Sequence, residues 1–347
     1  SGIATAALLA SGYTTTAVAN TESWNGTSWT EVADVNTAKN GLAAAGTNTA
    51  GWKAGGSPVT TAAEEWNASL AVGAWSTQTS LNTARNDVEG AGSSAEAALA
   101  FGGQTPGGVS ALTESWNGSA WTEVNDLNTA RNGFAGNGTQ TSALGYGQDD
   151  PARSAKTESW NGSSWTEVND LNTAKRAVTG LGADNESALC FGGETASTDN
   201  LNETELWNGT SWTEVNNLNT ARTSMGGTGI VTAGLAVGGR VVPPSSGNAA
   251  VEQWDGTSWT EVGDLNTARY GGIASQFNYA NSFIAGGASP PNTYANTELW
   301  NGASWVEVAD LSTARQTLNG QGTSTLALAS GGQAPGGFQT ATEELSM

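Results

Sequence analysis

Among the side chains of this sequence, paired carboxylates have the type and spacing that acid–base catalysis or metal binding requires. Asp149 and Asp150 are adjacent, and Asp199 is followed closely by Glu203. Such pairs serve as general acid and base, or bind Ca²⁺ together with carbonyl oxygens. Neither pair has the spacing of a calcium-binding loop, and a solvated turn accounts for both. We therefore predict no metal site and no cofactor.

The residue types that the sequence lacks exclude other chemistries. There is no histidine, which excludes a Ser-His-Asp triad and an imidazole metal site. The one cysteine, Cys190, rules out an intrachain disulfide framework and lies in "ALCFGG", where other copies of a repeat have small residues. This context predicts a buried, unreactive thiol. We expect no enzymatic activity; the catalytic alternative is a carboxylate-dependent glycan hydrolase or lyase.

Charge and hydropathy narrow the range of partners. The 347 residues include 32 acidic and 12 basic ones, for a formal net charge of −20. This balance argues against a nucleic-acid partner. No run of about 18 apolar residues occurs, so no membrane insertion is expected. The opening "SGIATAALLASG" lacks the positive region of a signal peptide and matches the repeat, which predicts folded structure there.

The sequence consists of copies of one repeat, and the strands of this repeat must position any functional site. Its copies recur at intervals of 42 to 50 residues, which is the length of a propeller blade. Each copy divides into four short extended pieces, a to d, as in "RNGFAGNGT", "SALGYGQ", "KTESW" and "WTEVNDL" between 131 and 171. The Asn-Gly between c and d predicts a hairpin. The first Trp of each copy is Trp24, Trp66, Trp116, Trp160, Trp207, Trp254 or Trp300, and Leu345 takes this place in a final partial copy.

The order of these pieces resembles the kelch repeat. A basic residue precedes a strand of small residues, then an apolar strand ends in Gly-Gly ("AFGG" at 100–103, "CFGG" at 190–193, "AVGG" at 236–239), and a turn and a Trp follow. The resemblance implies an all-β propeller of four-stranded antiparallel blades. Some copies depart from the pattern: "GYGQ" at 145–148 and "ASGY" at 10–13 lose the Gly pair, and the second copy has a longer c to d turn, "NASLAVGA". The wording "WNGTSWTEV" is also similar to kelch-like repeats in structural proteins of marine bacteriophages.

Counting the pieces favours seven blades, with eight as the alternative. Pieces b and c occur eight times, whereas a and d occur seven times. We expect residues 1–323 to form one propeller, closed by N-terminal strands that pair with the strand at 315–323. Residues 324–347 would then be a surplus hairpin or a partial extra blade. Its unpaired edges would suit a homo-oligomer or assembly into a larger particle.

Recurrent aromatic and charged residues have a structural interpretation. A residue that every blade repeats is best explained by an environment that every blade shares, which is the packing between blades. We assign this role to Trp24, Trp29, Trp116, Trp121, Trp160, Trp165, Trp207, Trp212, Trp254, Trp259, Trp300 and Trp305. The cation after "NTA" or "STA" is expected to pair with a nearby carboxylate in each blade. These cations are Lys39, Arg85, Arg131, Lys175, Arg222, Arg269 and Arg315.

Specificity must come from the segments in which the copies differ. The b to c connections vary most in length and content, and the kelch resemblance places them together on one face. The residues predicted to contact a partner are Arg153, Arg240, Tyr294, Asp149 and Asp150. The alternative is that these loops are tolerated insertions at unconstrained tips.

Together these patterns predict a non-enzymatic structural or interaction module in an extracellular or virion setting. The partner would be a protein or a glycan: a host glycan, a receptor or another virion protein, met by a phage tail appendage or surface decoration. The alternative is a secreted bacterial carbohydrate-binding protein or adhesin.

Overall fold

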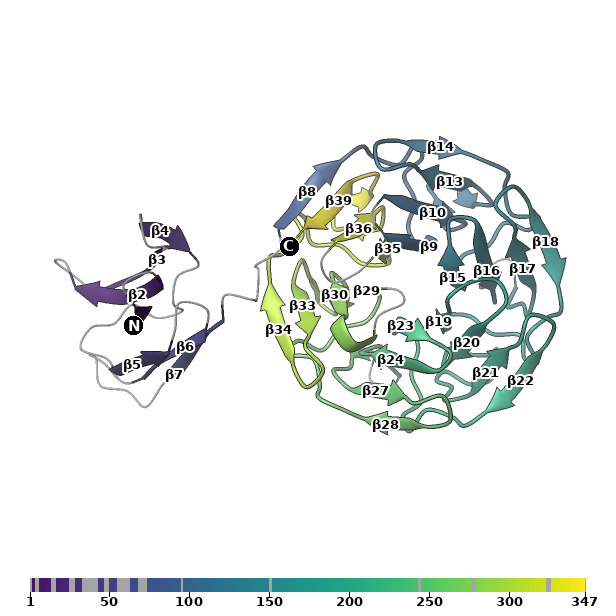
Figure 1. Ribbon diagram of the computed structural model, residues 1–347. Coiled ribbons are helices and arrows are strands. Elements are labelled where there is room, and N and C mark those ends of the chain that lie inside the picture. Colours follow the sequence, from purple (N-terminus) through teal and green to yellow (C-terminus); the bar gives the residue numbers. More distant parts are fainter. Residues whose placement is uncertain are drawn as a thin grey trace. The chain divides into compact units, whose positions relative to one another are not determined.

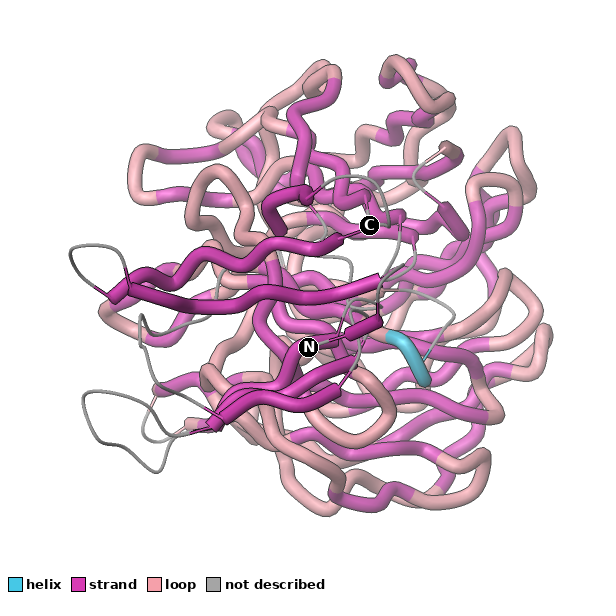
Figure 2. The backbone as a smooth tube through the Cα atoms, turned by 60° about the vertical axis from the view of Figure 1, so that its left-hand side comes forward, coloured by secondary structure: helices cyan, strands magenta, loops and turns pink. Residues whose placement is uncertain are grey.

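The computed structural model describes residues 2–346 except 4–5, 14–16, 25–28, 33–42, 47–49, 55–62, 68–73, 95, 150–151, 243–244, 276–278 and 323–325, and before Gln78 it describes only backbone course and pairing. The chain divides into two compact units, Ser1–Val72 and Gly73–Met347. Strands dominate both (Figure 2), and the helix drawn there is the short 3-10 helix η1, Tyr279–Asn281. Among the described residues, no helix is long and apolar enough to cross a membrane.

The unit of residues 73–347 is a β-propeller. Its described residues form six four-stranded antiparallel sheets, which Figure 1 shows arranged around a common axis. We number the sheets as blades and give their strands from the axis outward. They are blade 1, β9 (Glu89–Ser94), β10 (Ala97–Phe101), β13 (Thr113–Trp116) and β14 (Trp121–Glu123); blade 2, β15 (Ala135–Thr139), β16 (Ser142–Tyr146), β17 (Thr157–Trp160) and β18 (Trp165–Val168); blade 3, β19 (Thr179–Leu181), β20 (Ala188–Phe191), β21 (Thr204–Trp207) and β22 (Trp212–Val215); blade 4, β23 (Gly226–Ile230), β24 (Ala233–Val237), β27 (Val251–Trp254) and β28 (Trp259–Glu261); blade 5, β29 (Ile273–Ala274), β30 (Phe283–Ala285), β33 (Thr297–Trp300) and β34 (Trp305–Val308); and blade 6, β35 (Asn319–Gly322), β36 (Leu326–Ser330), β39 (Thr342–Ser346) and β8 (Ala74–Gln78).

The unit of residues 1–72 contains two further antiparallel sheets. One is four-stranded, in the order β1-β2-β3-β4, and the other is three-stranded, in the order β5-β6-β7. Their strands are β1 (Gly2–Ile3), β2 (Ala6–Tyr13), β3 (Ala17–Trp24), β4 (Trp29–Val32), β5 (Ala43–Gly46), β6 (Ala50–Ala54) and β7 (Ala63–Asn67). Trp24 and Trp29 pair across the β3–β4 hairpin, as the repeat predicts.

Propeller architecture and four-stranded blades are confirmed, but the favoured number of seven blades is wrong. The ring closes through β8, which pairs with β39 as the outermost strand of blade 6. The strand expected to pair with the N-terminal strands, β35, pairs with β36 instead. Residues 324–347, expected as a surplus hairpin, supply β36 and β39. Near-identical copies offer near-identical strand edges, so the copy that closes the ring is set by the geometry of the circle, which local sequence does not encode.

The local pattern of each copy explains its blade. In blade 2, Trp160 and Trp165 are paired across the β17–β18 hairpin. Asn161 Oδ1 accepts hydrogen bonds from the backbone N–H groups of Ser163 and Ser164, at 3.0 and 2.9 Å. Gly162 has φ = 91°, which a side chain would disfavour. The Asn-Gly signal thus fixes the turn through one amide acceptor and one left-handed residue.

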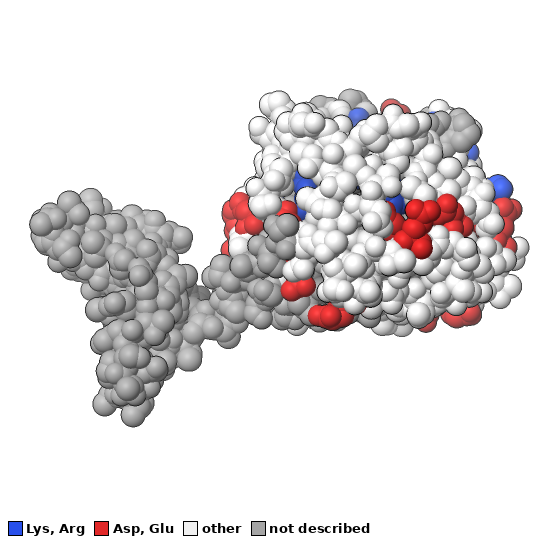
Figure 3. Space-filling model, turned by 90° about the horizontal axis from the view of Figure 1, so that it is seen from above, with Lys and Arg blue, Asp and Glu red and all other residues white. Residues whose placement is uncertain are grey.

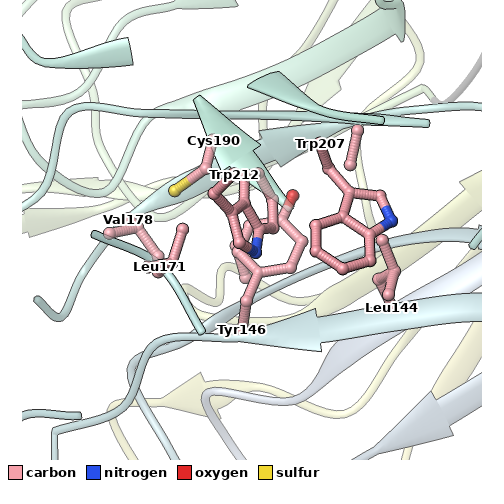
Figure 4. Packing of buried hydrophobic residues seen from close by; sticks show 9 residues of the cluster. Leu144, Tyr146, Leu171, Val178, Cys190, Trp207 and Trp212 are labelled. Atoms are coloured by element: carbon pink, nitrogen blue, oxygen red, sulfur yellow. The ribbon is translucent and has the colours of Figure 1, made fainter. Parts of the chain in front are cut away.

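The hydrophobic core lies between neighbouring blades (Figure 4). Tyr146 of blade 2 and Trp212 of blade 3 meet with ring centroids 4.8 Å apart. The ten Trp side chains of the repeat from Trp116 to Trp305 are at most 5% exposed. Their burial leaves no indole face among them for a sugar to stack on. Cys190 belongs to the same cluster, and burial raises the pKa of its thiol to about 12, which suits an unreactive group.

A buried ion pair anchors each blade. Arg131 and Glu158 are fully buried, and Arg131 Nη2 lies 2.5 Å from Glu158 Oε1. Equivalent pairs occur in the other blades, which confirms the expected pairing for the six described cations; Lys39 lies outside the described residues. The equivalents are Arg85–Glu114, Lys175–Glu205, Arg222–Glu252, Arg269–Glu298 and Arg315–Glu343. Because half of the chain's 12 cations are buried this way, acidic side chains prevail on the visible outer surface of the ring (Figure 3).

Candidate functional site

The candidate site is a cavity of about 250 Å³ at the end of the ring that carries the b to c connections. We call it the axial cavity. Residues from all six blades line it, among them Asp87, Asp149, Glu194, Arg240 and Thr317. A smaller cavity of about 100 Å³, which we call the channel, adjoins it between the inner strands β9, β15, β19, β23, β29 and β35 and shares Val88 and Glu89 with its lining.

A ring of left-handed residues surrounds this cavity. The residue two positions after each buried cation has a positive φ, and in four blades it is not glycine: Asp87 (49°), Ala177 (49°), Ser224 (52°) and Thr317 (48°). Such a conformation costs about 1–3 kcal/mol for a residue with a side chain and persists only where the surroundings impose it. Strain of this kind concentrates at functional sites, which directs attention to this rim.

Backbone hydrogen bonds impose that conformation. Five of the six rim residues donate their N–H to the carbonyl of the rim residue in the preceding blade. The bonds are Ala177 to Gly133 (2.7 Å), Ser224 to Ala177 (2.9 Å), Gly271 to Ser224 (3.0 Å), Thr317 to Gly271 (2.7 Å) and Asp87 to Thr317 (3.0 Å). The last bond joins blade 6 to blade 1, so the rim ties the ring together across its closing seam.

Gly-Gly turns place the first residues of the b to c connections beside the rim. Gly193 and Gly239 have φ of 93° and 108°, and each follows another left-handed glycine. The next residues, Glu194 and Arg240, form antiparallel bridges to Arg176 and Thr223 beside the rim. The chain then leaves the rim, in blade 4 through the short ribbon of β25 (Arg240–Val241) and β26 (Ser246–Gly247). Similar ribbons are β11 (Gln104–Thr105) with β12 (Gly108–Val109), β31 (Ala288–Ser289) with β32 (Asn292–Thr293), and β37 (Gln333–Ala334) with β38 (Gly337–Phe338).

Four charged residues at and beside the cavity form one ion-pair network. Arg176 Nη1 lies 2.5 Å from Asp149 Oδ2, and the same guanidinium contacts Glu194. Arg153 approaches Glu194 from outside the cavity, at 3.1 Å. This network fixes the loops of blades 2 and 3 against each other. Its charges are largely satisfied within the protein.

Arg240 differs from these residues. Its Nε donates a hydrogen bond to Ser245 Oγ at 2.8 Å, and its guanidinium carbon lies 5.9 Å from the centre of the Tyr270 ring. No carboxylate among the described residues lies within 4.0 Å of it. Arg240 therefore lines the cavity as a cation that has no carboxylate counter-ion among the described residues.

Asp87 and Glu89 carry the perturbed carboxyls of the site. Burial raises the pKa of Asp87 to about 6; the nearby Thr317 side chain opposes this rise, and the charge of Asp149 reinforces it. Burial also raises the pKa of Glu89, to about 8, and the nearby charge of Asp87 adds to this rise. The N–H of Gly136 donates to Glu89 Oε2 at 3.1 Å. Glu89 is therefore largely protonated at neutral pH.

The structure places the predicted contact residues unequally. Asp149 and Arg240 line the axial cavity, and Arg153 lies beside it through Glu194. Tyr294 does not line the cavity: its ring packs under the guanidinium of Arg269, 5.7 Å from the ring centre. Asp150 lies outside the described residues.

Sequence reasoning missed Asp87, Glu89, Arg176 and Glu194. A signal for the first two was present, because "RNDVEG" at 85–90 stands where other copies read "RNGFAG" or "RTSMGG". Two acids replace small residues there. Among the described residues, no three of His, Cys, Asp or Glu gather closely enough to hold a metal ion.

Comparison with known proteins identifies the fold and no more. No protein-family model matches the chain, and no curated protein matches its sequence. Among solved structures, the chain is similar to the one titled "Structure of YjhT", with a TM-score of 0.61 and 12% sequence identity. The alignment covers 77% of this chain and 96% of that chain. At this identity the similarity supports the propeller fold alone.

Proposed function

We propose that this chain is a non-enzymatic interaction module that binds a protein or a glycan through the b to c face of its propeller. One observation carries the proposal. The residues that the copies share are buried in blade packing and ion pairs, whereas the residues that differ gather at one face of the ring. A surface whose chemistry varies from blade to blade over an invariant scaffold suits recognition of one particular partner.

Hydrogen bonds between the loops of neighbouring blades support the same proposal. Asn200 Nδ2 donates to the carbonyl of Val242 at 2.5 Å, which joins the loops of blades 3 and 4. The N–H of Gly247 donates to Ser289 Oγ at 3.1 Å, which joins blades 4 and 5. Loops held to one another present a preorganised surface, which lowers the entropic cost of binding.

The proposed setting is extracellular, as part of a virion such as a phage tail appendage or surface decoration. Two features support it: the resemblance of the repeat to kelch-like repeats in structural proteins of marine bacteriophages, and the acidic, histidine-free composition. A host glycan, a receptor or another virion protein is then the partner.

Loop replacement on a glycan array tests this proposal. Residues 149–155 and 241–247 are replaced by Gly-Ser segments of equal length, which removes loop chemistry and leaves the blades intact. The control replaces Thr210 and Ser211 by glycine in the c to d turn, at the opposite end of blade 3. Glycan binding should vanish in the loop variant and persist in the control. Retained binding by the loop variant would overturn the proposal.

A carboxylate-dependent glycan hydrolase or lyase is the second candidate, favoured by the raised pKa of Glu89 at the channel. A carboxyl protonated near neutral pH can act as a general acid. The test is product release from a panel of polysaccharides. Activity abolished by Glu89→Gln and kept by Glu167→Gln, an exposed carboxylate, would support it. Absence of turnover by the intact chain on the whole panel would remove it.

A further inference from the structure

The axial cavity carries opposite charges on opposite sides. Asp87 belongs to the rim of blade 1 and Arg240 to the rim of blade 4, and both line the cavity. In a ring of six blades, blades 1 and 4 face each other across the axis, as Figure 1 shows for β9 and β23. The sequence copies place neither charge in the other blades: Asp87 stands where they have Gly133, Ala177, Ser224, Gly271 and Thr317.

The positive side is prepared for a carboxylate. Ser245 and the Tyr270 ring hold the Arg240 guanidinium from two directions. Its remaining N–H donors have no carboxylate partner among the described residues. A guanidinium binds a carboxylate through two parallel hydrogen bonds, and this geometry favours a carboxylate over a neutral oxygen.

The negative side is prepared for a cation. Asp87 is ionised above about pH 6, and the charge of Asp149 lies close enough to raise its pKa. Arg176 neutralises Asp149, so Asp87 retains the uncompensated negative charge. An ammonium group supplies three N–H donors and a compact positive charge, which would relieve the repulsion between these two carboxylates.

The size of the cavity limits the ligand. Its volume of about 250 Å³ lies below the usual range of about 300–1,000 Å³ for small-molecule sites. We propose that the axial cavity binds a small zwitterion of the size of a free amino acid, with its carboxylate on Arg240 and its ammonium on Asp87. This inference goes beyond the proposed function, since the ligand enters the axis and need not touch the loop tips.

The test is calorimetric titration of the full chain with the twenty common L-amino acids at pH 7.5. The tightest binder is then compared with its N-acetyl derivative, which lacks the ammonium, and its methyl ester, which lacks the carboxylate. We expect each derivative to bind at least about tenfold more weakly than the free amino acid.

Two variants separate the two ends of the site. Arg240→Gln should weaken the amino acid and the N-acetyl derivative about tenfold and leave the ester unchanged. Asp87→Asn should weaken the amino acid and the ester and leave the N-acetyl derivative unchanged; asparagine tolerates the left-handed backbone of this position. Lys156→Gln, on an exposed ion pair, is the control and should change nothing.

Two outcomes would overturn the inference: no amino acid that binds more tightly than about 10 mM, or derivatives that bind as tightly as the parent. Because Asp87 and Arg240 lie outside the segments replaced on the loop face, either result leaves the test of the proposed function standing. Conversely, a loop face without a partner does not affect the titration.

Discussion

Trp165 Nε1 donates a buried hydrogen bond to Thr113 Oγ1 at 3.1 Å, and this bond joins the outer strand of blade 2 to the third strand of blade 1. The same bond joins later blades, and a longer one at 3.4 Å joins Trp121 of blade 1 to Thr342 of blade 6. The later bonds are Trp212 to Thr157 and Trp259 to Thr204. The recurrent Trp and Thr thus stabilise four of the six seams between blades, including the one between blades 6 and 1, whereas Trp305 donates to the carbonyl of Gly263.

Removal of one such indole should therefore destabilise the whole ring. Trp165 also packs on Phe101, with centroids 4.8 Å apart. We expect Trp165→Ala to lower the free energy of unfolding by about 3–5 kcal/mol, the usual cost of emptying a core aromatic site. Trp165→Phe, which keeps an aromatic ring, should cost less. Denaturant unfolding followed by fluorescence measures both, and a loss below about 1 kcal/mol for the alanine variant would mean that the indole is not part of the packing.

The sequence predicted the blade better than it predicted the ring. The Asn-Gly turn, the period-2 strands and the recurrent cation are local signals, and within the described blades of the ring the structure has them where they were expected. The number of blades, in contrast, is decided by which strands pair to close the ring. It depends on whether β8 pairs with its chain neighbour β7 or with β39, and the letters of "AWSTQ" do not distinguish these partners.

The residues of the candidate site also divide into those that the sequence predicted and those that it did not. Asp149 and Arg240 were predicted because loop variability is visible in an alignment of copies. Asp87 and Glu89 were missed because both belong to piece a of the repeat, which the sequence analysis assigned to the strands that build the blade. Asp87 lines the axial cavity and Glu89 lines both the cavity and the channel, and these spaces exist only once six blades have met.

The buried ion pairs provide a second prediction. Glu158 accepts hydrogen bonds from Arg131, from the backbone of Asn128 and from the backbone of Thr129. Glu158→Gln removes the negative charge and leaves a buried guanidinium uncompensated, so we expect a loss of about 3–5 kcal/mol. Glu167→Gln, in an exposed pair with Lys156, should leave the unfolding midpoint unchanged. Equal midpoints for the two variants would contradict this account.

The strained rim leads to a third prediction, with an unusual sign. Ala177 has φ = 49°, so glycine relieves strain there at the cost of greater freedom in the unfolded chain. We expect Ala177→Gly to leave stability unchanged or to raise it by up to about 1 kcal/mol. Ala135→Gly, in strand β15, should lower stability by about 0.5–1 kcal/mol. Thermal melting of both variants decides the matter, and a destabilised Ala177→Gly would show that the rim is relaxed.

The carboxyl of Glu89, which lines the channel, provides a fourth prediction, on how the stability of the protein depends on pH. The pKa of Glu89 is about 8 in the folded protein, against an ordinary value of 4.5. The folded state therefore holds this proton more tightly than the unfolded state, so the stability linked to it is complete below about pH 4.5 and falls as pH rises to about 8. Glu89→Gln cannot ionise, and its stability advantage over the wild type should grow across this interval. Melting curves between pH 5 and 8 measure the difference; a constant difference would mean that Glu89 titrates normally.

The closing strand provides the fifth prediction. β8 pairs with β39 over five residue pairs, from Thr342 with Gln78 to Ser346 with Ala74. A chain that begins at Gly73 keeps this strand, and we expect it to fold with the unfolding midpoint of the ring in the full chain. A chain that begins at Ser80 lacks β8 and leaves β39 with an unpaired edge, which lowers stability and favours aggregation. Circular dichroism melting and size-exclusion chromatography compare the two.

Deletion of residues 324–347 separates this closure from the one that the sequence favoured. If those residues were a surplus hairpin, their loss would spare the ring. In the structure they supply β36 and β39, so their removal takes two of the four strands of blade 6 and leaves β8 and β35 without partners. We therefore expect this truncated chain to lose cooperative unfolding, while the chain that begins at Gly73 keeps it. A cooperative transition in the chain truncated after residue 323 would show that the ring closes without β39, and the pairing of β8 would then have to be abandoned.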